Sequence, residues 1–428
     1  MRVSFYTLGC KLNFSESSAA SSLFAKKGFR TVPFGEETDV VVINTCTVTA
    51  KAEKKCRNII RKSVKMYPGA YIIVAGCYSQ LKSDEIASIP GVDLVLGSGE
   101  KSDIFKYIKG FDKTEKPDIF TGDISRENIF SPAYSLSGRT RSFLKIQDGC
   151  DYFCSYCTIP LARGRSRNAP VADIVEQAKI IAERGIKEIV LTGVNIGDFG
   201  KTTGESFIEL VGHLDKVEGI ERFRISSIEP NLLTDDLIMF VAGSRRFAPH
   251  FHIPLQSGSD EILAKMNRRY KRDLFAERVS RIFSVMPAAG VGADIITGFP
   301  GEDEKKFYDT LYFLERLDLS YIHVFSYSER DGTRASSLGE QVSPEEKERR
   351  SGILHDLSEK KQLDFFRRNY GSQHFVIFEE GSEEEKMTGY TGNYIKVKTN
   401  RDAARINRLT RVKLAGISGD GFMSGEIG

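Results

Sequence analysis

The sequence predicts an α/β protein made of three parts. We expect an open parallel α/β sheet in residues 1–135, a partial (β/α)6 barrel in residues 139–367 and a small antiparallel β-barrel in residues 368–428. Short apolar runs alternate with helical patterns in the first part, six strand-like runs alternate with helices in the second, and short strands with glycine-containing turns make up the third. A length of 428 residues suits three domains of about 150 residues each.

In the first part, three apolar runs are bounded by turn residues, as expected of buried parallel strands. They cover residues 3–7, 40–43 and 71–75, and helical patterns follow at 15–27 and 50–65. Strands that alternate with helices in this way form βαβ units, which predict an open sheet with helices on its faces.

Each of these three strands ends next to a cysteine, at Cys10, Cys46 and Cys77. Parallel strands have their carboxyl ends at one edge of the sheet, where such folds bind ligands. Buried cysteine is also a common small apolar filler. Three of them at equivalent strand ends nevertheless favour a metal cluster held by three thiolates. Cys56, on a predicted helix with basic neighbours, receives no role.

In the second part, strand-like runs recur at 142–146, 188–192, 222–227, 250–255, 292–297 and 322–327. Helical patterns separate them, so six βα units that close wholly or partly into a barrel fit the spacing. The loops after the strands of such barrels carry function. Here these loops are polar and contain glycine, which any turn favours, but they all lie on one face.

The loop after the first of these strands carries the run GCDYFCSYCT at 149–158, with Cys150, Cys154 and Cys157. Ferredoxin clusters normally use four cysteines, and structural zinc sites fill all four positions. The alternatives are structural thiols or a zinc site completed by a distant histidine. The chain has six histidines, and none lies within 50 residues after Cys157. The spacing therefore predicts a 4Fe–4S cluster with one open iron.

In the third part, short strands are expected at 376–379, 394–398 and 411–414. Residues 387–413 contain seven basic side chains and one acidic side chain, Asp402, a local net charge of +6, with Tyr390 and Tyr394 beside them. Basic residues near aromatic residues on a small barrel are typical of RNA binding. A solvated charged face remains the alternative. The candidate RNA-binding residues here are Lys396, Lys398 and Arg401.

The composition, 40% apolar and 28% charged, is that of an ordinary soluble protein. No run approaches the roughly 18 apolar residues of a membrane helix, and the first residues resemble a strand, without the apolar core of a signal peptide. Seven cysteines, clustered and without an export signal, favour a reducing compartment and metal binding over disulfides. We therefore expect a cytoplasmic protein with no membrane partner.

With these motifs in place, the chain resembles the radical S-adenosylmethionine (SAM) methylthiotransferases over essentially its full length. GCKLN at 9–13, NTCTVT at 44–49 and AGC at 75–77 match the N-terminal pattern of the family, and the C-terminal barrel would be of the TRAM type. PLARGRSR at 160–167 and TGVNIGDFG at 192–200 look most like the branch that acts on N6-threonylcarbamoyladenosine at position 37 of tRNA, beside the anticodon. In that branch the adenine C2 carbon receives the methylthio group.

The resemblance implies two 4Fe–4S clusters and SAM as cofactors, with the chemistry on the cofactors rather than on a catalytic side chain. The cluster on Cys150, Cys154 and Cys157 would bind SAM at its open iron and yield a 5′-deoxyadenosyl radical that removes hydrogen from C2. The cluster on the three N-terminal cysteines would deliver the sulfur, methylated by another SAM. Tyr156 is the family position near the SAM adenine. The candidates for its methionine and ribose ends are Gly193, Glu229, Gln256, Asp294 and Thr297.

The resemblance also implies partners: the tRNA anticodon loop, a low-potential electron donor of the flavodoxin or ferredoxin type, and a sulfur donor. The threonylcarbamoyl group ends in a carboxylate, which suits the fork of an arginine. Arg163, Arg165 and Arg167 follow the cluster loop, and our hypothesis is that at least one of them binds this carboxylate or a flanking phosphate.

Three alternative functions remain. The first two are sister activities, on isopentenyl-adenosine in tRNA and on an aspartate of a small-subunit ribosomal protein. Isopentenyl-adenosine calls for an apolar pocket where this chain places arginines, whereas the protein-modifying enzyme shares the overall layout. The third is a non-catalytic iron–sulfur RNA-binding redox sensor, which needs neither an open iron nor SAM-binding loops.

Overall fold

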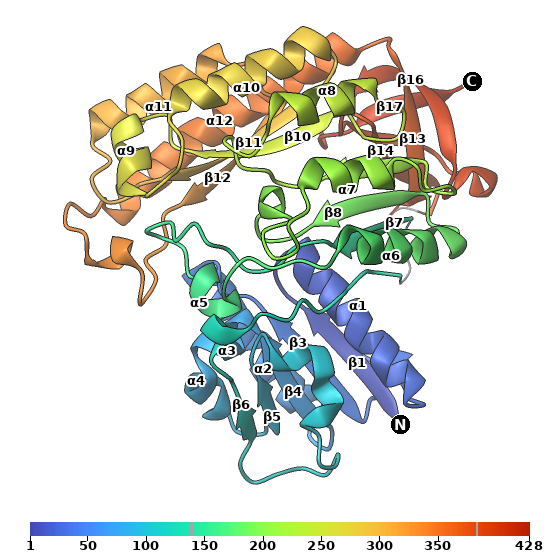
Figure 1. The fold of residues 1–428 in the computed structure, drawn as a ribbon, viewed down its shortest axis with the longest axis vertical. Helices are drawn as coiled ribbons and strands as arrows, with labels where there is room; N and C mark the ends of the chain where they lie inside the picture. Colours follow the sequence, from blue (N-terminus) through green and yellow to red (C-terminus); the bar gives the residue numbers. More distant parts are fainter. Residues whose placement is uncertain (137–139, 382–383) are drawn as a thin grey trace.

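The computed structural model describes residues 1–136, 140–381 and 384–428. The N-terminal sheet forms a smaller lobe below a larger body that contains the central strands and the C-terminal barrel (Figure 1). The predicted start of the second part, residue 139, lies outside the described residues, and the exact domain boundaries stay predictions.

The N-terminal lobe is a six-stranded parallel sheet in the order β2-β1-β3-β4-β5-β6. β3 and β4 are buried along their whole length, and their successive side chains enter the apolar cores on the two faces of the sheet in turn. The elements of this lobe are β1 (Arg2–Thr7), α1 (Lys11–Lys26), β2 (Arg30–Val32), β3 (Val40–Thr45), α2 (Ala50–Met66), β4 (Tyr71–Gly76), α3 (Cys77–Leu81), α4 (Ser83–Ala87), β5 (Leu94–Leu96), η1 (Glu100–Lys106), β6 (Asp118–Phe120) and η2 (Ile124–Arg126).

Helix α1 begins four residues earlier than its apolar pattern predicts, directly after Cys10. The reason is the polar side chain of Asn13, which is buried and donates to the carbonyl oxygens of Leu8 (2.7 Å) and Thr45 (3.0 Å). This side chain is satisfied by the ends of β1 and β3 rather than by water, so the first turn of the helix is held against the edge of the sheet.

The central part consists of two three-stranded parallel sheets, β7-β8-β9 and β10-β11-β12. Parallel bridges Phe223–Phe247 and Ser227–His252 join β9 and its following loop to β10 and the residues before it, so the six strands run side by side in chain order. This confirms the predicted partial (β/α)6 barrel. Its elements are β7 (Arg141–Lys145), α5 (Ile159–Arg163), α6 (Val171–Glu183), β8 (Glu188–Thr192), η3 (Ile196–Asp198), α7 (Phe207–Leu214), β9 (Arg222–Ile225), α8 (Asp235–Gly243), β10 (His250–Gln256), α9 (Asp260–Lys265), α10 (Arg272–Val285), β11 (Gly290–Thr297), α11 (Glu304–Arg316), β12 (Tyr321–Ser326), η4 (Arg334–Ser337) and α12 (Pro344–Asn369).

The C-terminal part is a closed barrel in the order β13-β14-β15-β17-β16. Its neighbouring strands are antiparallel except for β15 and β17, which are parallel, so the predicted antiparallel barrel is correct in all but this pair. The strands β14 and β17 were not predicted, because glycine and polar residues interrupt their apolar alternation. The elements are β13 (Gln373–Glu380), β14 (Lys386–Thr391), β15 (Lys396–Asn400), η5 (Ala403–Arg405), β16 (Leu409–Ile417) and β17 (Met423–Ile427).

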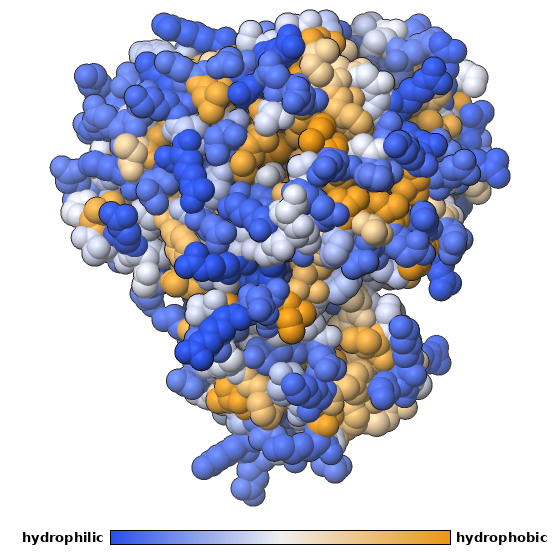
Figure 2. All heavy atoms as spheres, in the orientation of Figure 1, coloured by the Kyte–Doolittle hydropathy of each residue, from blue (hydrophilic) through white to orange (hydrophobic). Residues whose placement is uncertain are grey.

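Hydrophilic side chains cover most of the face shown in Figure 2 and separate several smaller apolar patches. Among the described residues, no helix is both long and apolar enough to cross a membrane.

Candidate functional site

The three N-terminal cysteines lie at the carboxyl edge of the parallel sheet. Cys10 caps α1, Cys46 follows β3 and Cys77 begins α3 directly after β4. The thiols of Cys10 and Cys46 each interact electrostatically with that of Cys77, which shows that the three sulfurs share one neighbourhood. Cys10 is exposed, whereas Cys46 and Cys77 are buried. The fold thus brings together three thiols from distant parts of the chain.

Two glycines let the backbone approach these thiols closely. A Cβ atom on Gly9 would lie 2.9 Å from the Cys46 Sγ atom, and one on Gly76 would lie 2.6 Å from the Asn44 Oδ1 atom. Both glycines have positive φ, +101° and +110°, a conformation that residues with a Cβ rarely adopt. Three converging thiols on a glycine-lined edge fit the donor set of an iron–sulfur cluster, and this role stays a prediction.

Cys56 packs against this site although the sequence assigned it no role. It is fully buried on α2, and its Sγ atom lies 3.5 Å from the backbone nitrogen and 3.4 Å from the carbonyl oxygen of Cys46. Burial raises the pKa of its thiol to about 11. Cys56 is therefore a neutral thiol that packs against the backbone of Cys46 and supports this loop.

The second set of thiols lies on the loop after β7. The backbone N–H groups of Tyr152 and Ile159 point at the Sγ atoms of Cys150 (3.5 Å) and Cys157 (3.4 Å). Phe153 has a positive φ of 49°, which turns the loop between its first two cysteines. N–H donors aimed at cysteine sulfurs stabilise thiolates and tune iron–sulfur clusters, so the donor set fits such a cluster.

Arg268 completes the surroundings of this loop. Its Nη1 atom lies 3.1 Å from the Cys154 Sγ atom and 3.4 Å from the Tyr156 hydroxyl, and its Nη2 atom forms an ion pair with Glu229. Burial raises the pKa of the Cys150 and Cys157 thiols to about 12, a shift that iron binding would reverse because a metal displaces the thiol proton.

The predicted SAM-binding residues lie around the same end of the partial barrel. Gly193 packs against Gln147, and a Cβ atom added to Gly193 would lie 2.8 Å from the Gln147 carbonyl oxygen. Thr297 is buried at the end of β11. Gln256 ends β10 with a positive φ of 70°. Tyr156 and Glu229 share Arg268. Their role in SAM binding stays a prediction.

Asp294, the remaining SAM candidate, belongs to a polar group inside the barrel. Its Oδ1 atom lies 2.8 Å from His252 Nε2 and 3.3 Å from His323 Nδ1. Burial favours a raised pKa for this carboxyl, but the two imidazoles outweigh it and bring the pKa well below its usual range. A negative charge is therefore held within the barrel.

The three arginines after the cluster loop have different surroundings. The Arg163 side chain is 2% exposed and donates to Cys77 Sγ (3.2 Å), Asn13 Oδ1 (2.7 Å), Glu16 and Asp148. Arg167 is also buried and donates to the carbonyl oxygens of Arg163 and Ile129. The Arg165 side chain is 69% exposed. Of the three, Arg165 is the one open to a large partner.

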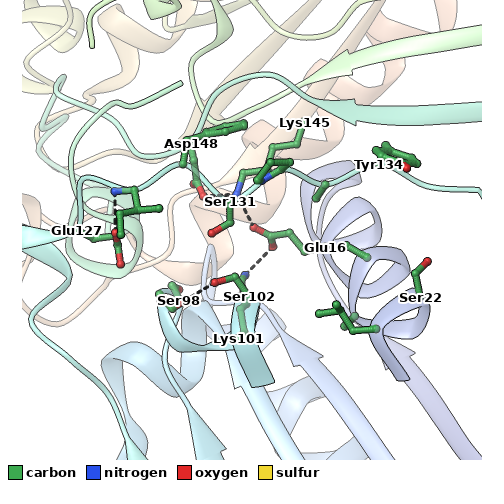
Figure 3. A pocket seen from close by; sticks show the side chains of 18 of the residues that line it. Glu16, Ser22, Ser98, Lys101, Ser102, Glu127, Ser131, Tyr134, Lys145 and Asp148 are labelled. Atoms are coloured by element: carbon green, nitrogen blue, oxygen red, sulfur yellow. Dashed lines mark hydrogen bonds and ion pairs between the residues drawn. The ribbon is translucent and has the colours of Figure 1, made fainter. Parts of the chain in front are cut away.

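A cavity of about 490 Å³ lies between α1, the 127–134 segment and β7, beside this arginine cluster. In Figure 3 the Glu16 carboxylate lies between two lysines on its wall; it pairs with Lys101 at 2.6 Å and with Lys145 at 3.3 Å. Asp148 pairs with Lys145 at 2.6 Å. These cations overcome the effect of burial and hold the pKa of both carboxyls well below its usual range. The ion pair between Glu16 and Lys145 joins the N-terminal lobe to the central part.

The basic residues of the C-terminal barrel are partly paired. Lys398 forms an ion pair with Asp420 at 2.6 Å, and Arg401 forms one with Glu380 at 2.9 Å. Lys396 is exposed and lies over the Phe422 ring at 5.6 Å. These exposed or half-exposed side chains leave the predicted RNA-binding surface accessible.

Sequence reasoning missed Arg268, the residue in contact with both Cys154 and Tyr156. Its signal is weak, because the run NRRY at 267–270 lies in a loop and contains two adjacent arginines. It also missed Gln147, whose Oε1 atom accepts from the backbone N–H groups of Val194 (3.0 Å) and Asn195 (2.8 Å). No pattern in the sequence links those positions.

Two family models match the chain. Residues 2–97 match the family described as uncharacterized protein family UPF0004, and residues 144–314 match the radical SAM superfamily. Among solved structures, the radical SAM methyltransferase TsrM from Kitasatospora setae is similar with a TM-score of 0.55 at 14% identity, over 78% of this chain and 77% of that chain. At this identity the likeness shows the fold alone.

Curated relatives match along nearly the whole chain. The threonylcarbamoyladenosine tRNA methylthiotransferase MtaB of Bacillus subtilis is 38% identical over 96% of this chain and 93% of its own, and that of Aquifex aeolicus is 37% identical over 96% and 100%. A tRNA-2-methylthio-N(6)-dimethylallyladenosine synthase of Syntrophus aciditrophicus is 34% identical over 90% and 86%. The chain therefore belongs to the radical SAM methylthiotransferases, a family of enzymes that use SAM and a 4Fe–4S cluster.

Proposed function

We propose that the enzyme attaches a methylthio group to C2 of N6-threonylcarbamoyladenosine at position 37 of tRNA. The observation that carries the reaction type is the bridge formed by Arg163. Its Nε atom contacts Cys77 Sγ at 3.2 Å, and its Nη1 atom contacts Asp148, two residues before Cys150, at 3.0 Å. One side chain therefore contacts Cys77 and the segment that leads into the Cys150 loop, which supports a reaction shared by the two triplets. The names of the relatives from B. subtilis and A. aeolicus support the choice of substrate.

The proposal assigns a 4Fe–4S cluster to each triplet, the second one on Cys10, Cys46 and Cys77. When bound, the clusters and SAM supply a 5′-deoxyadenosyl radical and a methylated sulfur, as implied by the family resemblance. The side chains around them hold these groups in place and exclude water. Arg268 orients the Cys154 loop, and its ion pair with Glu229 fixes the wall on which SAM would lie.

For the tRNA, the proposal assigns the anticodon loop to the face with the C-terminal barrel, whose Lys396, Lys398 and Arg401 would meet phosphates. The exposed Arg165, next to the cluster loop, would meet a phosphate flanking the target base. A low-potential electron donor and a source of sulfur complete the reaction. Clustered free cysteines favour a reducing compartment, so the proposed location is the cytoplasm.

Dimethylallyladenosine in tRNA is the second candidate substrate, because a relative at 34% identity is named for it. The two candidates differ in charge, since the threonylcarbamoyl group carries a carboxylate and the dimethylallyl group is apolar. The higher identity to relatives named for threonylcarbamoyladenosine, 38% and 37% against 34%, supports the former.

The test uses the anaerobically reconstituted enzyme with tRNA that carries either modified base, and mass spectrometry of the nucleosides. We expect the 2-methylthio product from threonylcarbamoyladenosine. Cys77→Ala should still cleave SAM to 5′-deoxyadenosine without forming this product, whereas Cys150→Ala should lose both activities. If a methylthio product forms only from tRNA that carries dimethylallyladenosine, that base is the substrate and the proposed one is wrong. If Cys150→Ala still cleaves SAM, the assignment of the clusters is wrong.

A further inference from the structure

Helix stability does not explain why a lysine stands at position 11, directly after Cys10. It is the first residue of α1, where the helix dipole disfavours a positive charge. The side chain is only partly exposed. Within residues 1–136, 140–381 and 384–428, the Lys11 ammonium has no carboxylate partner and no hydrogen-bond acceptor. The three N–H donors of the Lys11 ammonium are therefore available to a ligand.

The charges that face Lys11 come from the strands of the partial barrel and are mostly positive. Arg224 and Arg141 lie within electrostatic range of its ammonium, together with Glu188. Glu188 already accepts from Arg224 Nε at 3.1 Å, and Arg141 already pairs with Glu379 at 3.1 Å. The two acidic groups are therefore occupied by the two arginines, and the positive charge of Lys11 stays without a carboxylate partner among the described residues.

A row of stacked rings lies beside these cations, formed between the C-terminal barrel and β10. Tyr390 stacks on Tyr394 at 4.7 Å, and Tyr394 stacks on His250 at 4.4 Å. Arg141 lies over Tyr390 at 4.5 Å, and Arg224 lies over Tyr394 at 4.7 Å. Aromatic rings with adjacent guanidinium groups are the usual platform for an unpaired nucleobase.

Two features of this row are unusual. Tyr394 has a positive φ of 75° in the turn between β14 and β15, a conformation that a bulky residue rarely adopts. His250 is 4% exposed, and its Nδ1 atom has no hydrogen-bond partner among the described residues, although its Nε2 atom bonds to Tyr321 at 2.9 Å. A buried polar atom without a partner indicates a missing ligand or water.

We infer that Lys11 binds the carboxylate of the threonylcarbamoyl group, while the partly exposed edges of Tyr390 and Tyr394 provide the surface against which the modified base lies. This inference rests on the proposed function. A lysine ammonium offers three donors and makes charge-assisted hydrogen bonds to carboxylates. Arg163 and Arg167 are occupied by internal partners, so Lys11 takes the carboxylate-reading role considered for that cluster. Because Lys11 directly follows Cys10, the bound carboxylate would lie beside the thiols assigned to sulfur transfer.

The test compares two anticodon stem-loop RNAs, one with threonylcarbamoyladenosine and one in which the same carboxylate is converted to the neutral amide. Dissociation constants are measured with the anaerobic, iron-loaded enzyme. Wild type should bind the acid about 10-fold to 100-fold more tightly than the amide, the range of a charge-assisted hydrogen bond. Lys11→Met should bind both RNAs with the affinity that wild type has for the amide, and Lys11→Arg should keep a preference for the acid.

Lys62→Met is the matched control, because Lys62 is exposed on α2 of the same lobe. This variant should keep the full preference for the acid. Iron content and SAM affinity are measured on each variant, and both should match wild type. Tyr394→Leu should weaken binding of the acid and the amide by the same factor, since stacking does not depend on the carboxylate.

The outcomes separate the inference from the proposed function. If wild type binds the acid and the amide equally, the carboxylate is not recognised and the proposed substrate is wrong. If wild type prefers the acid and Lys11→Met keeps that preference, the inference is overturned while the substrate stands. A loss of SAM affinity in Lys11→Met, with the preference unchanged, would assign the lysine to SAM and also overturn it.

Discussion

The Nε atom of Arg163 lies 3.2 Å from the Sγ atom of Cys77, so a guanidinium of the central part donates to a thiol of the N-terminal lobe. The same guanidinium pairs with Glu16 at 2.9 Å and with Asp148 at 3.0 Å. One buried side chain therefore connects two cysteine sites that are built on different sheets. It also explains why an arginine directly after a cluster loop need not contact substrate.

Replacement of Arg163 should destabilise the fold far more than replacement of its exposed neighbour. Arg163→Met leaves the buried Asn13 Oδ1 atom without its donor and removes one cation from Glu16 and from Asp148, which costs about 1–3 kcal/mol. Arg165→Met should change the free energy of unfolding by less than about 0.5 kcal/mol. Urea unfolding of the iron-free chains measures both. Equal effects of the two variants would mean that Arg163 is not the link between the lobes.

Acid should weaken the contact between the lobes through Glu16. The cations around Glu16 hold its pKa well below the usual range despite burial. Because the folded pKa is the lower one, this carboxylate contributes stability above the unfolded pKa of about 4.3, and the contribution disappears as the pH falls below about 5. The free energy of unfolding should therefore fall between about pH 5 and pH 2.

Glu16→Gln tests this assignment in the iron-free chain, because acid itself releases iron–sulfur clusters. The variant should be less stable than wild type at pH 7 and should lose part of the slope with pH, so the two curves approach each other in acid. Glu384→Gln, at an exposed position, is the control and should follow wild type. Parallel curves for Glu16→Gln and wild type would rule out Glu16 as a source of the slope.

Arg268 should raise the reduction potential of the cluster on Cys150, Cys154 and Cys157. Hydrogen bonds to cluster sulfurs favour the reduced, more negative state, and Arg268 Nη1 lies 3.1 Å from Cys154 Sγ. Arg268→Gln should shift the potential downward by about 60 mV for each ~1.4 kcal/mol of hydrogen-bond energy lost. A redox titration followed by electron paramagnetic resonance gives the value. Arg269→Gln should leave it unchanged, since Arg269 donates to the carbonyl oxygen of Asp151 instead.

Gly76 should be required for the geometry of the N-terminal thiols. Its φ of +110° and the 2.6 Å between a built Cβ and Asn44 Oδ1 leave no room for a side chain. Gly76→Ala should lower stability by about 1–3 kcal/mol and reduce the iron bound per chain by up to half. Gly69→Ala, before the same strand, has open space and serves as the control. Full iron loading of Gly76→Ala would show that the edge tolerates a side chain.

Much of the fold was predictable because the central strands are buried and their patterns are strong. β8 has the predicted bounds, and β3 and β4 differ from prediction only at their ends. The short strands β2, β5 and β6, of three residues each, were missed because so short a run has no measurable period. The start of α1 was missed because the Asn13 side chain is satisfied by strands distant in sequence.

The sequence by itself determined the chemistry available to this protein. Two cysteine triplets, their place after predicted strands and the basic C-terminal segment are properties of residue type and spacing. Only the tertiary structure decided which charged residues are free to act. Arg163 and Arg167 are occupied by partners from both lobes, whereas Lys11 has none among the described residues. Whether a charge binds a partner within the protein or a ligand depends on contacts between segments far apart in the chain, and spacing along the sequence does not encode those contacts.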